Sequence, residues 1–415
     1  MAAALGCGLA AACLGQLGKA PRATGGFLLA YAAAFLPYVA AVRIAFRPGA
    51  RVSFTLVLGA ALAARVLVFA AAPSDDVNRY LWEGRVQAQG ENPYRVAPSD
   101  PRLAPLRDDL WRGVNHPDLP AIYPPITQIA QRLVHASGLG APGWKASMAA
   151  LDLLVILALG ALLRARGAPP GRAVVYAWSP LAIFQVAGRG HHEPLLILPL
   201  IVAALLLGGG AARSRAARIG AGVLAALGAM AKWSGLPLLL VWGRCLAPAG
   251  LAAGVATIAL ATLPYADAGT GIFTALRRFH ADFHFADSIN ALLAALAGPR
   301  AGRMIGAAAL AAVALWLARR PGDSARRARV LFGAMLLLSP TVHPWYLLWV
   351  LPWLVLGRPW GWLALTATVP LYVGLLEVIA GPVADLREVA WWKALAWGPG
   401  VVIWTTQGWK ARAAT

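Results

Sequence analysis

The chain has 415 residues, of which 59% are hydrophobic and only 13% are charged. In soluble domains about a quarter of the residues are charged. One or two soluble cores cannot bury so large an apolar fraction as this chain has. The composition therefore excludes a soluble enzyme, a disordered chain and a fibre. It predicts an all-α polytopic membrane protein.

The basic residues outnumber the acidic ones, with 37 Lys+Arg against 17 Asp+Glu and a net charge of +20. They gather in short clusters between apolar stretches, such as Arg43, Arg47 and Arg51. Cytoplasmic loops of membrane proteins carry such clusters, so the charge reports topology and predicts no nucleic-acid partner. The cysteines have no metal-ligand spacing and indicate no disulfide framework.

Apolar runs follow one another along most of the chain. Several are shorter than the ~20 residues of a straight crossing, so we expect about 12–14 membrane helices, some of them tilted or broken. The first run lacks the basic start and the cleavage site of a signal peptide, and we expect it to be a membrane helix. Gly and Pro between Lys232 and Pro237 predict a break inside a later run.

A long polar stretch, residues 73–144, follows the third apolar run. With a cytoplasmic N-terminus, three spans place this loop outside the membrane, and eight of the 17 acidic residues lie in it. The positions of Val77, Leu81 and Val86 predict a short amphipathic helix on the membrane surface. Residues 121–138 should form an interfacial or re-entrant helix. Because long loops often carry function, we expect this one to be catalytic.

A second outer loop is expected over residues 267–300. It contains His280, Asp282, His284 and Asp287. Polar clusters of this kind are usually solvated, so we assign no chemistry to this one.

Asp75 and Asp76 come directly after the third apolar run. A carboxylate at the outer edge of an apolar bundle can act as a general base or hold a sugar hydroxyl, and partial burial tunes its pKa. The alternative is that one of the two caps the helix that follows. Both interpretations stay open from the sequence.

Another outer turn, Gly188–Pro194, presents Arg189, His191, His192 and Glu193 at one membrane face. This set suits the wall of a pocket for a sugar or a phosphate. A metal site is a weaker alternative, because the histidines lack the i, i+4 spacing of helical zinc ligands. The remaining alternative is a solvated turn whose glutamate starts a helix.

Three further polar residues stand in or beside apolar runs. Lys232 lies within one, where ionisable groups are costly and suggest a site for an anion such as a lipid phosphate, unless the side chain snorkels to the interface. His343, beside Trp345 and Tyr346, suits either a phosphate site or an aromatic belt at the membrane interface. Asp152 is expected to support the structure by pairing with Lys232, Arg189 or a helix end.

The predicted topology brings candidates of both signs to one outer face, among them Asp76, Arg189, Lys232 and His343. This arrangement suggests chemistry on an amphiphile with an exposed anionic head. A transporter would place its polar groups near the midplane and would show repeated broken helices, which we do not find in the sequence. A lipid-linked-sugar flippase and a non-catalytic scaffold remain the alternatives.

Six short motifs occur in an order that resembles a known family of membrane enzymes. They are Asp75-Asp76 with Gly90-Glu91-Asn92-Pro93-Tyr94; Ile122-Tyr123-Pro124-Pro125; Asp152-Leu153; Gly188-Arg189-Gly190-His191-His192-Glu193; Lys232 with Pro237; and His343-Pro344-Trp345-Tyr346-Leu347-Leu348-Trp349. In this order they resemble glycosyltransferases of the C-type fold, which take sugar from polyprenyl-phosphate donors. The first mannosyltransferase of GPI-anchor synthesis and the actinobacterial polyprenol-phosphate-mannose-dependent mannosyltransferases are the most similar groups.

The resemblance implies a bundle with an extracytoplasmic catalytic loop in a bacterial cytoplasmic membrane. It implies inverting-type transfer of a sugar, with mannose expected, from a polyprenyl-phosphate donor to a hydroxyl of a glycan or glycolipid acceptor among membrane lipids. The alternative functions named above stay open beside it.

The resemblance also implies roles for single residues. Asp76 lies at the matching distance before Gly90 and is the expected base, with Asp75 as the other candidate. Ser74 stands where the family's spaced acidic pattern has its first acid, which weakens the case for a bound metal, and we expect no cofactor. The expected binding residues are Lys232, Arg189 and His343 for the donor phosphate, and Arg79, Tyr94, Tyr123, His191, His192, Glu193 and Tyr346 for the rest of the pocket.

Overall fold

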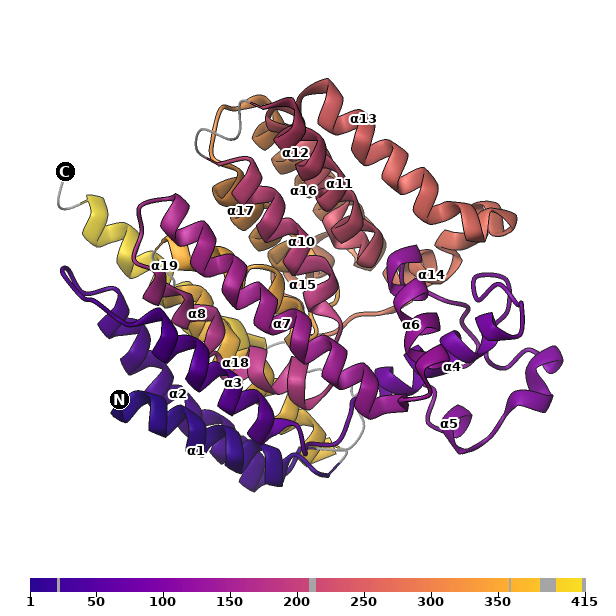
Figure 1. The fold of residues 1–415 in the computed structure, drawn as a ribbon, viewed down its shortest axis with the longest axis horizontal. Helices are drawn as coiled ribbons and strands as arrows, with labels where there is room; N and C mark the ends of the chain where they lie inside the picture. Colours follow the sequence, from indigo (N-terminus) through magenta and orange to yellow (C-terminus); the bar gives the residue numbers. More distant parts are fainter. Residues whose placement is uncertain (21–22, 209–213, 358–359, 381–392, 413–415) are drawn as a thin grey trace. The chain divides into compact units, whose positions relative to one another are not determined.

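The computed structural model describes residues 1–20, 23–208, 214–357, 360–380 and 393–412, and the regular elements within these ranges are all helices (Figure 1). The nearest approach to a sheet in these ranges is one isolated bridge between Phe285 and Thr341. The predicted all-α class is confirmed.

Some of the described helices are long and apolar enough to cross a membrane, and they number five by length and composition: Gly25–Ala45, Gly140–Ala165, Gly243–Asp282, Pro299–Arg319 and Trp360–Ile379. Shorter apolar helices lie at Ala2–Leu17, Phe54–Val68, Glu193–Leu206 and Pro344–Leu356. A crossing helix needs about 20 residues. These helices indicate an α-helical membrane protein.

The chain forms two compact units, each assembled from separate stretches of sequence. Unit 1 comprises Met1–Ala72, Leu159–Gly188 and His284–Thr415, and unit 2 comprises Pro73–Ala158 and Arg189–Phe283.

Unit 2 contains both predicted catalytic residues and most of the predicted binding residues. Its elements are α4 (Asp75–Ala88), η1 (Pro101–Leu106), α5 (Asp109–Arg112), α6 (Pro125–Ser137), the first part of α7 (Gly140–Ala165), α10 (Glu193–Leu206), α11 (Arg215–Ala231), η5 (Trp233–Gly235), α12 (Pro237–Val241), α13 (Gly243–Thr262), η6 (Leu263–Phe273) and α14 (Thr274–Asp282). Helix α11 packs between α10 and α13, and the three run side by side in Figure 1.

Helices are present in both stretches where the sequence predicts them, as α4 within residues 73–144 and as α6 within residues 121–138, and they pack directly on each other. Their backbones approach closely at Gly84, where an added Cβ would lie 2.4 Å from the carbonyl oxygen of Gln131. A larger residue at this position would force the two helices apart. Ser74 starts α4 by accepting a hydrogen bond from the amide of Asp76, as expected of an N-cap.

The predicted break near Lys232 is confirmed. Helix α11 ends at Ala231, Lys232 is extended with φ −152° and ψ 127°, and a 3-10 turn leads into α12 at Pro237. Proline at the first position of a helix forfeits no hydrogen bond, which explains why the chain can resume a helix there.

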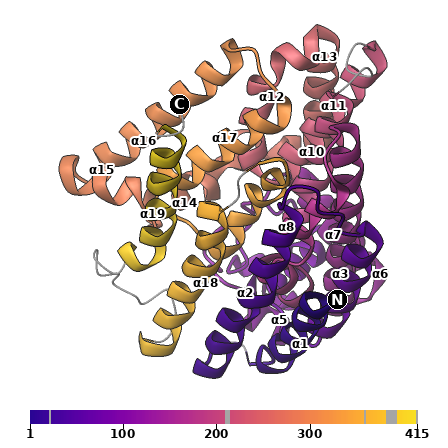
Figure 2. The ribbon, with the colours of Figure 1, turned by 90° about the vertical axis from the view of Figure 1, so that its left-hand side faces the viewer.

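Unit 1 contains the remaining elements: α1 (Ala2–Leu17), α2 (Gly25–Ala45), α3 (Phe54–Val68), the end of α7, η2 (Pro170–Ala173), α8 (Val174–Ala177), α9 (Pro180–Ala182), η3 (Ile183–Gly188), α15 (Ile289–Ala297), α16 (Pro299–Arg319), α17 (Ser324–Leu338), η7 (Pro344–Trp349), η8 (Leu351–Leu356), α18 (Trp360–Ala380) and α19 (Lys393–Arg412). Figure 2 shows α18 beside α2, where the Tyr31 hydroxyl donates to the Thr366 carbonyl at 2.9 Å. Buried Arg65 similarly joins α3 to the Ala177 carbonyl at 2.9 Å.

The expectation that residues 267–300 form a solvated polar loop is wrong in part. Most of this stretch is helical, and Asp287 is buried at 2% exposure, where it pairs with Lys393 and accepts a hydrogen bond from Asn290. A buried carboxylate needs such partners, which the sequence pattern did not reveal. His280, Asp282 and His284 are exposed as expected.

Candidate functional site

A turn before α10 meets the start of α4 inside unit 2. The amide of Ser74 donates to the carbonyl of Arg189 at 2.8 Å, so Asp75 and Asp76 lie next to the histidines that follow Arg189. Gly190 has φ +83°, and an added Cβ would come within 2.9 Å of Val77. Only glycine takes this backbone conformation at little cost while leaving room for α4.

Neither of the two carboxylates at the start of α4 caps the helix. Ser74 is the N-cap, so the alternative that Asp75 or Asp76 caps the helix is wrong. The Nδ2 of Asn115 donates to Asp76 at 2.8 Å and to Asp75 at 3.2 Å. Asn115 therefore holds the two carboxylates side by side while Asp75 stays exposed to solvent.

Asp76 is the more enclosed of the two, with its side chain 14% exposed. The Tyr80 hydroxyl lies 3.3 Å from one carboxylate oxygen, and His191 Nδ1 lies 3.6 Å from the same oxygen. Burial is the main cause that raises the pKa of Asp76 to about 6, and the charge of Asp75 adds to it. Asn115 and Lys232 act in the opposite direction. A carboxylate of this kind is poised to accept a proton near neutral pH.

An aromatic cluster lies beside Asp76. The ring of Tyr80 packs at 4.9 Å from Trp144, 5.4 Å from Tyr123 and 5.1 Å from His192, measured between centroids. His192 Nδ1 also lies 3.0 Å from the Tyr80 hydroxyl. Burial, together with the charge of Lys232, holds the pKa of His192 well below its usual range, so this imidazole is neutral.

A buried ion pair completes this side of unit 2. Lys232, extended at the end of α11, reaches Glu193 at the start of α10, and the two side chains are 9% and 0% exposed. The Lys232 ammonium also lies 6.0 Å from the centre of the Tyr123 ring. Glu193 does start a helix, as one alternative held, but the turn is buried instead of solvated.

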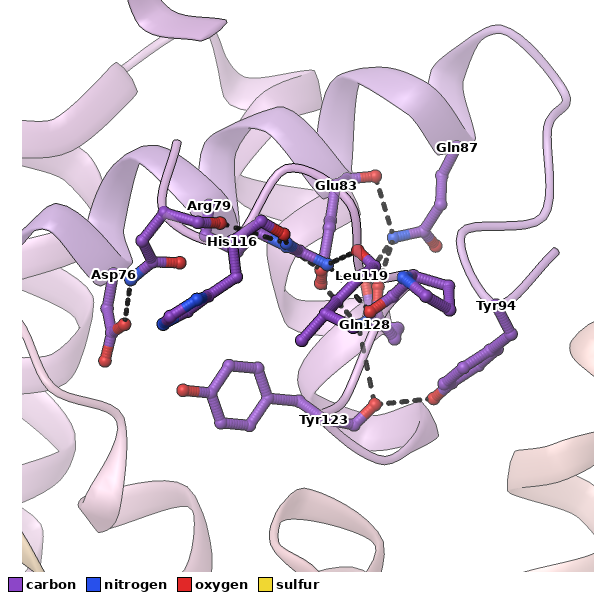
Figure 3. Close-up of polar contacts among 11 residues, drawn as sticks. Asp76, Arg79, Glu83, Gln87, Tyr94, His116, Leu119, Tyr123 and Gln128 are labelled. Carbon is purple, nitrogen blue, oxygen red and sulfur yellow. Dashed lines mark hydrogen bonds and ion pairs between the residues drawn. The ribbon is translucent and has the colours of Figure 1, made fainter. Parts of the chain in front are cut away.

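Arg79 holds the loop before residue 121 against α4. Its guanidinium pairs with Glu83 at 2.5 Å and donates to four backbone carbonyls, which are those of Asn115, His116, Leu119 and Pro120. Figure 3 shows the carbonyl groups of His116 and Leu119 turned toward it. Residue Arg79 is only 5% exposed, so the N–H groups of its guanidinium stabilise the fold that positions Asn115.

Tyr94 is a second positioning residue. Its hydroxyl donates to the Tyr123 carbonyl at 2.6 Å, which also receives a longer contact from Gln128 (Figure 3). Its ring packs against Tyr265. These contacts fix the backbone of Tyr123, whose own ring faces His192 at 4.5 Å.

Unit 1 contains His343 and Tyr346. His343 stacks on Trp345 with ring centroids 4.6 Å apart and an interplanar angle of 4°, and Tyr346 contacts its edge at 5.3 Å. Tyr346 in turn stacks on Trp349. The expected aromatic surroundings of His343 are therefore present.

The sequence did not single out Tyr80, Asn115 or Lys145. Tyr80 lies one helical turn after Asp76, so the predicted helix already placed the two on one face. Lys145 on α7 is buried at 4% exposure, and its Cγ lies close to Gly190. Buried Asp152 shares α7 with it.

The residues of unit 2 thus combine a carboxylate with a near-neutral pKa, a buried ammonium and an aromatic wall. Among the residues that the structure describes, no group of three or more His, Cys, Asp and Glu side chains could hold a metal ion. Compared with known proteins, the chain matches no family model, no curated protein and no solved structure.

Proposed function

We propose that the chain is a membrane glycosyltransferase that moves a sugar, with mannose as the expected one, from a polyprenyl-phosphate donor to a hydroxyl of a glycan or glycolipid. The observation that carries the proposal is Asp76. Its carboxylate is held by Asn115, lies beside Tyr80 and His191, and has a pKa of about 6. General bases work best when their pKa lies near the operating pH.

The reaction is a displacement at the anomeric carbon. Asp76 takes the proton of the acceptor hydroxyl as the acceptor oxygen bonds to that carbon. The bond from the carbon to the phosphate oxygen breaks, and the electron pair leaves with the polyprenyl phosphate. Attack opposite the departing phosphate inverts the configuration of the sugar.

The departing phosphate needs a cation more than it needs an acid, because a phosphate is already a stable leaving group. Lys232 is the first candidate, since it is a buried ammonium whose charge also acts on Asp76. An ammonium fixed where negative charge develops stabilises a transition state. Arg189, which also lies in unit 2, is a further proposed phosphate ligand.

The order of the six motifs supports a C-type bundle of about 12–14 membrane helices, with residues 73–144 on the outer face of a bacterial cytoplasmic membrane. In that arrangement α4 and α6 form the catalytic loop, and the apolar helices hold the lipid tail.

The test uses the purified full chain with polyprenyl-phosphate-mannose and extracted membrane lipids. The proposal predicts a lipid product heavier by one hexose, together with release of polyprenyl phosphate. Movement of labelled donor across vesicle membranes without any glycosidic product would instead identify a flippase. Absence of both, with unchanged cellular function in Asp75 and Asp76 variants, would identify a scaffold.

A further inference from the structure

Two buried polar atoms beside Asp76 have no hydrogen-bond partner among the residues that the structure describes. They are Nε2 of His192 and Oε2 of Glu193, on residues that are 1% and 0% exposed. A buried polar atom without a partner is costly, so proteins rarely keep one without a use. Both atoms belong to consecutive residues at the start of α10.

The hydrogen bonds of Tyr80 determine the tautomer of His192. At pH 7 an ionised Asp76 can only accept, so the single proton of the Tyr80 hydroxyl points to Asp76. The hydroxyl oxygen then accepts from Nδ1 of His192, 3.0 Å away. Because the imidazole is neutral, its Nε2 bears a lone pair and no proton.

His192 Nε2 and Glu193 Oε2 are therefore both acceptors. The side chains that carry them lie near the ring of Tyr123. Tyr123 packs against the His192 ring at 4.5 Å and lies 6.0 Å from the ammonium of Lys232, which holds the other oxygen of Glu193. Tyr123 is partly exposed, whereas His192 and Glu193 are buried. Tyr123 is thus the partly exposed residue that lies beside both the His192 ring and the Lys232–Glu193 ion pair.

We propose that His192 Nε2 and Glu193 Oε2 form a subsite that accepts hydrogen bonds from sugar hydroxyl groups, with Tyr80 as the residue that sets the acceptor tautomer. The assignment rests on the proposed function, and it identifies the sugar hydroxyl groups as the part of the substrate that these two atoms bind. Two acceptors suit a polyol, which donates from several adjacent hydroxyls. They do not suit a phosphate, whose oxygens have no proton to offer when ionised.

The proposal predicts that the affinity depends on particular hydroxyls. A site built to bond a hydroxyl rejects the analogue that lacks it, because the buried acceptor is then left unpaired. We expect the wild type to bind at least one monodeoxy sugar about tenfold more weakly than the parent. In His192→Phe, which keeps a ring to pack on Tyr80 and Tyr123, this difference should disappear.

The experiment measures dissociation constants by titration calorimetry of the full chain in detergent. The probes are a short-chain prenyl phosphomannose and its analogues that lack the 2-, 3-, 4- or 6-hydroxyl. Tyr80→Phe should lose part of the discrimination, since the tautomer is no longer set. The matched control is His135→Phe, which replaces a histidine on α6 that takes no part in these contacts. This variant should discriminate between the parent sugar and its deoxy analogues as the wild type does.

A second series without phosphate, methyl α-mannopyranoside and its monodeoxy forms, separates this inference from the proposed function. Discrimination that depends on His192 in this series supports the subsite even if phosphomannose does not bind, a result that would overturn the proposed donor alone. Equal binding of all deoxy forms to the wild type would overturn the subsite and indicate a bound water at these atoms. Discrimination that survives in His192→Phe would also overturn the subsite. The absence of any sugar binding would overturn it as well.

Discussion

The side-chain amide of Asn115 donates to Asp76 at 2.8 Å from a loop that is 39 residues further along the chain. The same nitrogen contacts Asp75 at 3.2 Å. This amide keeps two like charges adjacent at the start of α4 and counteracts part of the rise in the pKa of Asp76. The bond therefore links the loop held by Arg79 to the protonation of the proposed base.

The first prediction concerns the pH profile. Asp76 must be ionised to accept a proton, so transfer should rise with pH through about 6 and then level off. Asn115→Ala removes a bond that lowers the pKa, so this ascending limb should move to higher pH. The measurement is the initial rate of transfer from pH 5 to 8. An ascending limb at the same pH in both proteins would contradict the role of Asn115.

The second prediction concerns stability. The pKa of Asp76 rises from an ordinary value of 3.8 to about 6 in the folded chain, so above pH 6 its ionisation opposes folding. This cost is on the order of 3 kcal/mol at most, and it fades as the pH falls toward 4. Asp76→Asn removes it and should unfold at a higher temperature than the wild type at pH 7.5, with a smaller gain at pH 5.

The control for this experiment is Asp109→Asn on α5, where the side chain is 92% exposed. Its unfolding temperature should follow that of the wild type at both pH values. Lower stability of Asp76→Asn at pH 7.5 would show that the carboxylate is held by favourable contacts which outweigh its burial.

The third prediction separates the structural and the chemical roles of Lys232. Removing one partner of a buried ion pair costs about 3–5 kcal/mol, because the other charge stays behind. Lys232→Met should therefore destabilise the chain, and the double variant Lys232→Met with Glu193→Gln should recover much of that loss. Donor use should stay poor in both, since neither has the ammonium.

Thermal unfolding and the donor KM check this pair of variants. Arg95→Met is the matched control, because Arg95 and Asp267 form an ion pair with both side chains more than half exposed. Such a pair contributes about 1 kcal/mol or less. A double variant with a normal donor KM would show that Lys232 serves only to neutralise Glu193.

The fourth prediction concerns Arg79. Its contacts with Glu83 and four carbonyls assign it to the fold, so Arg79→Gln should lower the unfolding temperature and kcat while leaving the donor KM nearly unchanged. The loss of kcat follows from a loop that no longer positions Asn115. A stable variant with a raised donor KM would instead place Arg79 in contact with the substrate.

Much of the local structure followed from the sequence. The spacing of Val77, Leu81 and Val86 predicted α4, and the Gly and Pro residues after Lys232 predicted the break where this cation sits. Such features depend on neighbours within one or two helical turns, so a single chain reveals them.

The parts that the sequence did not reveal depend on distant partners. Asn115 reaches Asp76 from a loop whose carbonyls are bound by Arg79, and no local pattern marks an asparagine for that position. Asp287 looked solvated because its partner Lys393 lies 106 residues away. Arg79 looked like a pocket residue for the same reason, since its acceptors are backbone carbonyls that carry no sequence signal.

The central claim is that Asp76 accepts the proton of the acceptor hydroxyl. The direct measurement is a single-turnover assay in which wild type and Asp76→Asn, both loaded with polyprenyl-phosphate-mannose, receive an extracted lipid acceptor. The wild type should form the product that is heavier by one hexose, and Asp76→Asn should bind the donor equally well but form product at least about 100-fold more slowly. Product formation by Asp76→Asn at the wild-type rate would contradict the claim.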